Sequence, residues 1–384
     1  MRYFFESGVF PELSFVELVS VFHSFNISPD CIRRTDEKIL LVESNALTIN
    51  ELHKIFLRLG GFVRFGIVID DLDTFLTPYT KQEKITFAVS SLNSKNVTLK
   101  EIQSLSNDIK RNFKKIGISS RFILPKRNVL NAAQITKNNI LEEGFELCIF
   151  DIKRERYFGN TIAVQDINSF VKRDLDKPFS DYDMGVLPQK LARIMCNLTG
   201  LKEGIIWDPF CGSGTILMEA SELGFDVLGS DIDIRSIEGS EQNLRWLLGE
   251  DTKYNVFYLD IHNVEKKAIR HLKLTGINAV VCEPFMGPPQ RRVISMSKAE
   301  ELLNNVKKIY ISLFKVLDQI STSNFKVVLI LPEYKTTNGW ISLRIKDIVG
   351  KKWDILNRQL GEKDLKWKRI NSIITRSIFV LSKK

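Results

Sequence analysis

The chain has 384 residues, 44% of them apolar, with a formal net charge of +9 and a sequence pI near 9.1. This length and apolar fraction are typical of two or three domains with cores of their own, and they exclude a disordered or fibrous protein. Basic clusters along the chain favour a polyanionic partner, although a charged surface that keeps the protein in solution is the plainer explanation.

The residue pattern also argues against a secreted, a membrane-spanning, a metal-binding and a disulfide-rich protein. The start, MRYFFESGVF, carries Glu6 and lacks the basic and apolar blocks of a signal peptide, and the longest aliphatic runs have strand length. The five cysteines and four histidines follow no disulfide or metal-ligand spacing. We therefore expect a cytoplasmic protein without a membrane span, a metal site or a disulfide framework.

The first 165 residues mix short strands and helices, which predicts an α+β arrangement. Polar, turn-rich stretches at 72–82 and 167–184 predict breaks between domains. Strands are predicted at 38–43, 63–69, 84–90, 120–125, 145–152 and 161–166, and helices near 14–24, 50–58, 100–115 and 130–141.

The last 200 residues alternate strand and helix patterns, which predicts a parallel sheet with helices on both faces. The strands are predicted at 205–208, 227–231, 256–260, 279–283 and 326–332, with helices at 234–248 and 299–317 among those between them. Ligands of such sheets bind beyond the carboxyl ends of the strands, so the strand ends are where a site is expected.

A glycine-rich turn, DPFCGSGT at 208–215, follows the first of these strands. Its glycines let the backbone pass close under a ligand, where a Cβ atom would intrude. The turn matches neither the dinucleotide fingerprint nor the phosphate-binding loop with its lysine. By itself it is also compatible with a plain tight connection between strand and helix.

Two further acids stand at the ends of the next strands, and they favour a ligand over a plain turn. Asp231 lies 23 residues after Asp208, where an acid can accept both ribose hydroxyls, and Asp260 could accept from an adenine amino group. A ligand with an amine, a ribose and an adenine would contact all three acids. S-adenosylmethionine fits this description.

The segment DPFCGSGTILMEAS resembles motif I of class I methyltransferases, specifically of the THUMP-domain RNA methyltransferases. ELSFVELVSVF near the start is similar to the N-terminal ferredoxin-like domain of the tRNA guanine-10 N2-methyltransferase subfamily, and RFILPKRNVLNAAQITKNNILEEGFELCIF to the THUMP core. TIAVQDINSFVKRDLDKPFSDYDMGVLPQKLARIMCNLTG is similar to the linker and the segment before motif I.

The resemblance implies a Rossmann-like class I methyltransferase domain with a mostly parallel seven-stranded sheet, C-terminal to an α+β half. The domain ranges that it implies are a ferredoxin-like domain at 1–75, a THUMP domain at 76–166, a linker at 167–184 and the methyltransferase domain at 185–384.

The resemblance also implies a set of residues that bind S-adenosylmethionine. Asp208, Gly212 and Gly214 would lie near the methionine part, Asp231 would hold the ribose, and Asp260 would hold the adenine with its neighbour. The remaining candidates lie beside these or in the segment that covers the cofactor in such proteins: Leu187, Pro188, Lys190, Pro209, Cys211, Thr215, Ile232 and Ile261.

For the N-terminal half, the resemblance implies that the THUMP domain grips the 3′-end of tRNA and sets the distance to the target nucleotide. The basic clusters at 110–115, 126–127 and 153–156 then become candidate phosphate contacts. Phe113, Phe122 and Tyr157 are candidates for stacking on unpaired bases, with core packing as the alternative for each.

The stretch NAVVCEPFMGPP at 278–289 is where the target base is expected. Enzymes that methylate exocyclic amines use Asp/Asn-Pro-Pro-Tyr/Phe at the end of the fourth strand, and an everted base is needed. Here Cys282 and Glu283 precede Pro284 and Phe285, so only the last two positions match. Gly287-Pro288-Pro289 is expected to shape the loop over the base, with Gln290, Arg291 and Arg292 at the mouth of the site.

This departure leaves several roles open. Glu283 replaces the usual acceptor of hydrogen bonds, or Cys282 acts as a nucleophile on a pyrimidine ring or is simply a small buried residue, or the target or the activity has changed. The C-terminal stretch 367–383 resembles the closing β-hairpin of the fold and keeps Trp367, Arg369 and Arg376.

We therefore expect a tRNA methyltransferase that transfers a methyl group from S-adenosylmethionine to an exocyclic amine of a guanosine. The alternatives are a protein that binds tRNA and cofactor without transferring a methyl group, methylation of another base, and a DNA N-methyltransferase. The THUMP-like half argues against the last.

Overall fold

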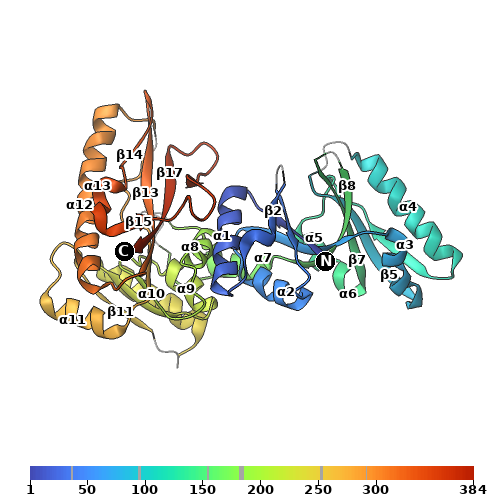
Figure 1. The fold of residues 1–384 in the computed structure, drawn as a ribbon, viewed down its shortest axis with the longest axis horizontal. Helices are drawn as coiled ribbons and strands as arrows, with labels where there is room; N and C mark the ends of the chain where they lie inside the picture. Colours follow the sequence, from blue (N-terminus) through green and yellow to red (C-terminus); the bar gives the residue numbers. More distant parts are fainter. Residues whose placement is uncertain (36–37, 94–96, 154, 181–185, 251–253, 291) are drawn as a thin grey trace. The chain divides into compact units, whose positions relative to one another are not determined.

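The computed structural model describes the chain in two compact units, and each is described here by itself (Figure 1). The N-terminal unit comprises Met1–Phe15 and Ser28–Ser169, and the C-terminal unit comprises Val16–Ile27 and Phe170–Lys384. The described residues are all of 1–384 except 36–37, 94–96, 154, 181–185, 251–253 and 291.

An eight-stranded mixed sheet forms the N-terminal unit, in the order β2-β3-β1-β4-β8-β7-β5-β6. β5 pairs in parallel with β7 and with β6, and the other neighbouring strands of this sheet are antiparallel. The strands are β1 Arg2–Ser7, β2 Ile32–Arg34, β3 Ile39–Glu43, β4 Phe62–Ile69, β5 Lys84–Ser91, β6 Ser119–Ile123, β7 Gly144–Ile152 and β8 Glu155–Val164. All six strands predicted for this part of the chain are confirmed, and β1 and β2 are additional.

Helices of this part of the chain begin where the sequence offers a cap. In α2, α4 and α5 the capping residue and the third helical residue bond each other's backbone, which satisfies N–H groups that the helix leaves unpaired. The predicted helix at 130–141 is two helices. The helical elements are α1 Pro11–Ser24, η1 Pro29–Cys31, α2 Ile49–Arg58, α3 Leu72–Leu76, η2 Thr77–Lys81, α4 Leu99–Lys115, α5 Ala132–Lys137, α6 Ile140–Glu143 and α7 Ile167–Leu175.

The predicted boundaries within this half remain predictions. Strands from the ranges 1–75 and 76–166 lie in one sheet, where β4 pairs with β8. The stretch predicted as a break at 72–82 is helical, because α3 and η2 occupy it. The predicted linker 167–184 begins with α7, and its residues 181–184 lie outside the described ones.

A buried ion pair lies in the middle of the N-terminal sheet. Arg64 on β4 donates from Nη1 to Glu146 Oε1 on β7 (3.0 Å) and from Nη2 to the Leu130 carbonyl (2.7 Å). The hydroxyls of Ser90 and Thr161 donate to the two Glu146 oxygens. Apart from Arg64 Nε, which lies 3.3 Å from a Glu6 carboxylate oxygen without a hydrogen bond, these groups have protein hydrogen-bond partners, as a buried charge requires.

The C-terminal unit has a nine-stranded sheet whose main path of seven strands runs β11-β10-β9-β12-β13-β17-β15, with β14 beside β13 and β16 beside β17. Along the main path all neighbours from β11 to β13 are parallel, and β17 is antiparallel to β13, β15 and β16. The predicted mostly parallel, Rossmann-like sheet is confirmed. The strands are β9 Ile205–Asp208, β10 Asp226–Asp231, β11 Asn255–Tyr258, β12 Ala279–Cys282, β13 Lys326–Thr336, β14 Gly339–Ser342, β15 Trp353–Ile355, β16 Leu365–Trp367 and β17 Ile374–Lys383.

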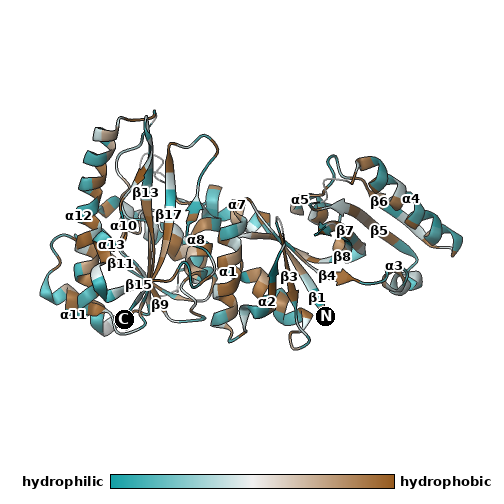
Figure 2. Ribbon diagram, turned by 45° about the horizontal axis from the view of Figure 1, so that its top comes forward, coloured by the Kyte–Doolittle hydropathy of each residue, from teal (hydrophilic) through white to brown (hydrophobic). Residues whose placement is uncertain are grey.

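The helices of this unit cover the sheet with apolar faces. Buried residues of the 25-residue helix α12 pack in one core cluster with β12 and β13, and Figure 1 shows α12 running along β13. In Figure 2 strand β13 is largely brown, as a strand buried on both faces requires. The helical elements are α8 Gln189–Asn197, α9 Thr215–Glu222, α10 Ile234–Leu248, α11 Lys266–Thr275, α12 Met296–Ile320, α13 Lys346–Val349 and η3 Gly350–Lys352.

A second buried ionic cluster joins α7 and α8 to α9, the helix that follows the glycine-rich turn. Glu219 on α9 accepts from Arg173 Nε (2.5 Å) and from Arg193 Nε (2.7 Å). Both guanidinium groups also lie over the Phe170 ring. These contacts hold α9 against α7 and α8, and they thereby also hold the glycine-rich turn that precedes α9.

Neither a membrane span nor a metal cluster is found in the part of the chain that the structure describes. No described helix is both long and apolar enough to cross a membrane. Within the same residues, no three His, Cys, Asp or Glu side chains gather as a metal site would require.

Candidate active site

Acidic residues from four neighbouring strands meet at the carboxyl edge of the C-terminal sheet. β9 ends at Asp208 and β10 at Asp231, and β12 ends one residue before Glu283. β11 ends at Tyr258, two residues earlier than predicted, so Asp260 lies in the turn that follows. Because these strands are parallel neighbours, their ends lie side by side.

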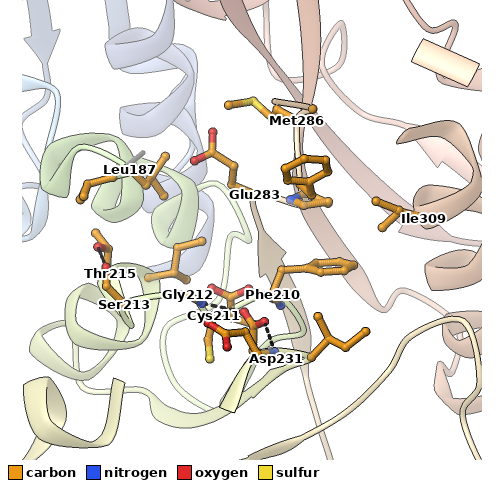
Figure 3. A pocket seen from close by; sticks show the side chains of 18 of the residues that line it. Leu187, Phe210, Cys211, Gly212, Ser213, Thr215, Asp231, Glu283, Met286 and Ile309 are labelled. Atoms are coloured by element: carbon orange, nitrogen blue, oxygen red, sulfur yellow. Dashed lines mark hydrogen bonds between the residues drawn. The ribbon is translucent and has the colours of Figure 1, made fainter. Parts of the chain in front are cut away.

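A cavity of about 590 Å³ opens at this edge, and all four acids line it. Figure 3 shows Asp231 and Gly212 at one end and Glu283 and Met286 at the other. The volume lies in the usual range for small-molecule and cofactor sites. The lining residues are Val186, Leu187, Asp208, Phe210, Cys211, Gly212, Ser213, Thr215, Ile216, Asp231, Ile232, Asp233, Leu259, Asp260, Ile261, His262, Glu283, Pro284, Phe285, Met286, Gly287, Pro289, Ile309, Arg369, Ser372, Ile374 and Arg376.

The glycine-rich turn has the conformation for which its glycines are needed. Gly212 and Gly214 have φ values of 50° and 75°, in the left-handed region that side chains disfavour. A Cβ on Gly212 would meet no atom within 4 Å, because that face of the turn borders the cavity. From α10, Ser240 donates to the Gly212 carbonyl (2.7 Å) and Asn243 to the Ser213 carbonyl (2.8 Å), which fixes the turn from behind.

Asp231 is held by backbone donors rather than by a cation. Its Oδ2 accepts from the Gly212 N–H (3.0 Å) and its Oδ1 from the Asp233 N–H (3.0 Å), drawn as dashed lines in Figure 3. Burial raises the pKa of Asp231 despite these bonds. A carboxylate has about four acceptor positions, so Asp231 keeps acceptor capacity for a ligand in the cavity that it lines.

Asp208 lies deeper, with 1% of its surface exposed. Its Oδ1 accepts from the Phe210 N–H (3.1 Å). Burial raises the pKa of Asp208 well above its usual range, and the negative charges of Asp231 and Glu283 raise it further. No cation of the described residues pairs with Asp208, so a positively charged ligand nearby would favour its ionised form.

Asp260 is the third acid at this end of the cavity, after Asp231 and Asp208. It accepts from the His262 N–H (2.9 Å) and from the side chain of Asn263 (2.7 Å), so its carboxylate orientation is fixed by its own turn. The apolar neighbours differ in burial, since Ile261 is buried whereas Ile232 is mostly exposed. Two apolar side chains around an acid provide the walls and the acceptor that a planar heterocycle with an amino group needs.

Nine of the thirteen residues predicted to bind the cofactor line the cavity, and four do not. Pro188 is the residue that caps α8, and Lys190 on that helix places its Nζ 5.5 Å from the centre of the Phe170 ring. Gly214 faces Ser240 instead of the cavity. The nine are Leu187, Asp208, Cys211, Gly212, Thr215, Asp231, Ile232, Asp260 and Ile261; the four are Pro188, Lys190, Pro209 and Gly214, whose role stays a prediction.

At the opposite end of the cavity, Glu283 is paired with Arg376 of β17. Arg376 Nε donates to Glu283 Oε1 (2.6 Å) and Nη2 approaches Oε2 at 3.4 Å. Both side chains line the cavity and are about 15% exposed. The pair therefore leaves the remaining acceptor positions of the carboxylate available on the cavity side.

Cys282 is fully buried and does not line the cavity. Its side chain belongs to the core cluster formed with α12, and burial raises the pKa of its thiol well above its usual range. A nucleophilic cysteine needs an accessible thiolate. The geometry thus supports neither an acceptor nor a nucleophile at this position, and the simple explanation of a small buried residue fits.

Pro284 and Phe285 line the cavity next to Glu283, as predicted for the target end. Phe285 has 55% of its surface exposed, so its ring is available to a ligand. Of the loop residues beyond, Gly287 and Pro289 line the cavity, and Pro288, Gln290 and Arg292 do not. Arg291 lies outside the described residues.

Several lining residues were not predicted from the sequence. Phe210 and Ser213 lie inside the glycine-rich turn and could have been included from their position alone. Arg376 lies 93 residues after Glu283, and no local pattern links the two. The remaining unpredicted ones come from loops, from the helices α9 and α12, and from the C-terminal hairpin: Val186, Ile216, Asp233, Leu259, His262, Met286, Ile309, Arg369, Ser372 and Ile374.

In the N-terminal unit, the basic cluster at 110–115 lies on α4. Lys110, Arg111 and Lys114 border a groove of about 440 Å³ on this helix. Phe113 is buried against Phe87 and is therefore core, not a stacking surface. Of the cluster at 153–156, residue 154 lies outside the described residues.

The sequence matches known methyltransferases. A family described as an RMKL-like methyltransferase domain (UPF0020) matches residues 180–344. A tRNA (guanine(10)-N2)-dimethyltransferase of Methanocaldococcus jannaschii is 31% identical over 175 residues, which cover 45% of this chain and 49% of the relative. A probable tRNA (guanine(10)-N2)-dimethyltransferase of Methanothermococcus thermolithotrophicus is 31% identical over 121 residues, 30% of this chain and 70% of the relative.

Among solved structures, TrmN from Thermus thermophilus has a TM-score of 0.52 with 14% sequence identity, and the match covers the whole of both chains. At this identity the likeness concerns the fold alone. The chain matches about half the length of the Methanocaldococcus jannaschii relative. The activity and substrates of the whole protein are therefore a matter for inference from the site.

Proposed function

The chain belongs to the family of tRNA (guanine(10)-N2)-methyltransferases, and we propose that it transfers a methyl group from S-adenosylmethionine to the exocyclic amine of a guanosine in tRNA. The observation that supports this is the cavity itself. One end presents three acids around a glycine-rich turn, and the other presents a carboxylate beside an exposed aromatic ring. A nucleoside cofactor and a target base need these two ends at once.

The residues present fit S-adenosylmethionine. The open face of Gly212 leaves room for the ligand backbone. The buried Asp208, which forms no ion pair within the described part of the chain, suits a positively charged amino-acid part. Asp231 would accept from the ribose hydroxyls and Asp260 from the adenine amine. The cofactor supplies an electrophilic methyl group on a positively charged sulfur.

At the target end, Glu283 would accept a hydrogen bond from the exocyclic amine. The lone pair of that amine is delocalised into the base, so its nitrogen is a poor nucleophile and must be oriented. A carboxylate acceptor stabilises the positive charge that develops on the nitrogen during transfer. Phe285 would stack on the everted base, and Arg376 would keep the Glu283 carboxylate in place.

For the N-terminal unit we propose a tRNA-binding role in the cytoplasm, in line with its resemblance to THUMP domains. The groove on α4, bordered by Lys110, Arg111 and Lys114, is a site where basic side chains converge on a polyanion. Removing these charges should weaken tRNA binding for any sequence and lower its salt dependence.

The activity can be tested with tritiated S-adenosylmethionine and unmodified bulk tRNA, followed by mass spectrometry of the nucleosides. We expect label in tRNA and N2-methylguanosine as the product. Measurable tRNA binding without incorporation would instead identify a binding protein that does not transfer methyl groups. A methylated adenosine or cytidine would overturn the assignment of the base.

The cofactor site has a separate test in Asp231→Asn. Loss of a charged acceptor at a half-buried site should weaken S-adenosylmethionine binding by about 1–3 kcal/mol, measured by calorimetry. Asp226→Asn, at the exposed start of the same strand, is the matched control and should bind normally. Equal affinity in both variants would contradict the placement of the ribose.

A further inference from the structure

The turn between β16 and β17 displays an apolar side chain to solvent. The Ser372 N–H donates to the Arg369 carbonyl (3.0 Å), which closes a β-turn with Ile370 and Asn371 at its two central positions. Asn371 has a φ of 63°, in the left-handed region that the third residue of a type II turn occupies and that asparagine tolerates. Ile370 is 93% exposed, more than any other large apolar side chain that the structure describes.

This turn is firmly held. The Lys335 N–H on β13 donates to the Ile373 carbonyl (2.8 Å), and the Ser372 hydroxyl donates to the Ile374 carbonyl. Behind the turn, β16 and β17 pair at Trp367 and Arg376. The position of Ile370 is therefore fixed by backbone bonds on both sides of it, and the side chain needs no packing partner to stay there.

The turn also forms part of the wall of the active-site cavity. Arg369 and Ser372, the first and last residues of the turn, both line the cavity. Ile374 and Arg376 on β17, the strand that follows the turn, line it as well. Ile370 itself is absent from the lining. Its side chain thus projects outside the cavity while its two flanks face in, at the wall that holds Glu283 through Arg376.

The charges beside Ile370 suit a nucleic acid. Lys368 and Arg369 directly precede it, and Lys368 is held over the Trp340 ring with its Nζ 4.3 Å from the ring centre. No described residue forms an ion pair with Arg369, which leaves its guanidinium for an anion. A single exposed isoleucine is ordinary on a protein surface. Ile370, however, is held by a rigid turn, follows two basic residues and lies beside a cavity that suits a base. This combination fits a partner that has both phosphates and apolar faces.

We propose that Ile370 is a wedge that enters the RNA stack and fills the space vacated when the target guanosine swings into the cavity. This rests on the proposed function, because a base can reach Glu283 only after it has left its stack. Apolar side chains between bases are used by other nucleic-acid-binding proteins to hold a distorted step open. Lys368 and Arg369 bind the flanking phosphates, and Phe285 receives the everted base.

The wedge can be tested with two full-length tRNA transcripts. In one the target guanosine is paired with cytosine, and in the other that cytosine is replaced by adenine, so the target base is already loosened. On the paired transcript, Ile370→Ala should lower kcat/KM at least about tenfold, whereas Ile370→Leu, which keeps an apolar wedge, should stay within about twofold. On the mismatched transcript the alanine variant should regain most of the wild-type rate.

Leu175→Ala provides the matched control, because Leu175 is another exposed apolar residue of the C-terminal unit that does not line the cavity. A second readout is the fluorescence of 2-aminopurine in place of the target guanosine, which should rise on binding wild-type protein and rise less with Ile370→Ala. An alanine variant that matches wild type on the paired transcript, or that loses equal activity on both transcripts, overturns the wedge. Absence of transfer by wild-type protein to either transcript would overturn the proposed function itself.

Discussion

Two arginine–glutamate pairs show how the same chemistry serves two purposes in this chain. In the N-terminal unit, Arg64 and Glu146 are sealed inside the sheet, with side-chain exposures of 3% and 0%. In the C-terminal unit, Arg376 and Glu283 are about 15% exposed and line a cavity. Both pairs join strands that are distant in sequence, so both depend on the finished fold.

The difference lies in what satisfies the carboxylate. Both oxygens of Glu146 accept from protein hydroxyls in addition to Arg64, so no acceptor position is directed at a ligand. Among the residues that the structure describes, Glu283 accepts hydrogen bonds from Arg376 alone. A buried and saturated pair contributes to structural integrity, whereas an unsaturated pair beside a cavity has acceptor capacity to offer a substrate.

The largest effect should come from the sealed pair. Glu146→Ala removes the carboxylate that is hydrogen-bonded to buried Arg64 and leaves Glu6, 3.3 Å from Arg64 Nε, as a partial counter-charge, so we expect it to destabilise the N-terminal unit by about 3 kcal/mol. All five tryptophans lie in the C-terminal unit, so circular dichroism should show an early transition that tryptophan fluorescence does not. Asp108→Ala removes an exposed pair with Arg111 and should cost less than about 1 kcal/mol. If both variants unfold like wild type, the sealed pair is not structural.

Substitution in the pair formed by Glu283 and Arg376 should lower the rate of methyl transfer and leave the stability of the protein nearly unchanged. Glu283→Gln keeps the volume but removes the negative charge, so kcat for methyl transfer should fall by about 10²–10³ while the KM for tRNA and the tryptophan-monitored unfolding change little. Single-turnover transfer with saturating cofactor measures the step directly. Unchanged turnover would refute the role of Glu283 as the acceptor, and a large loss of stability would place it with Arg64 and Glu146.

The sequence predicts site residues that belong to a local pattern, and it does not predict contacts between residues that are far apart in the chain. Asp208 and Asp231 could be placed because each ends a short apolar strand, and parallel strand ends share one edge. Glu283 could be placed for the same reason, but its partner could not. Arg376 reaches it because β17 inserts antiparallel beside β13, with Arg376 opposite Pro332, and only the assembled sheet fixes that register.

Other misses have local causes. β1 is buried almost throughout, so it lacks the alternation that marks a half-exposed strand. Asp260 was expected at a strand end, but the strand stops at Tyr258 and the acid is bonded within its own turn. For Cys282, sequence position at the strand end suggested a site residue, whereas its side chain points into the core formed with α12. In a strand, successive side chains point to opposite faces, and the choice of face decided its role.

A smaller effect on kcat is expected from a substitution that separates the charge of Arg376 from the planar shape of its guanidinium group. Arg376→Lys keeps the positive charge but loses the planar fork that contacts both Glu283 oxygens, so kcat should fall about tenfold, less than for Glu283→Gln. Arg344→Lys, at an exposed pair with Asp347, is the control and should leave kcat unchanged. A lysine variant as active as wild type would mean that Arg376 contributes only charge, and the positioning role would fail.

A pH-dependent effect concerns Asp208, a buried acid that, unlike Glu146 and Glu283, forms no ion pair with an arginine among the described residues. Its pKa is raised in the folded protein, so folding is unpenalised below the unfolded pKa of about 3.9 and loses stability as pH rises towards the folded pKa. Asp208→Asn cannot ionise and escapes that loss. Measured without cofactor by tryptophan fluorescence, the variant should gain stability relative to wild type as the pH rises from 4 to 7. A difference that stays constant over this range, or that favours wild type as pH rises, would mean that Asp208 is compensated in the folded protein as the two paired glutamates are.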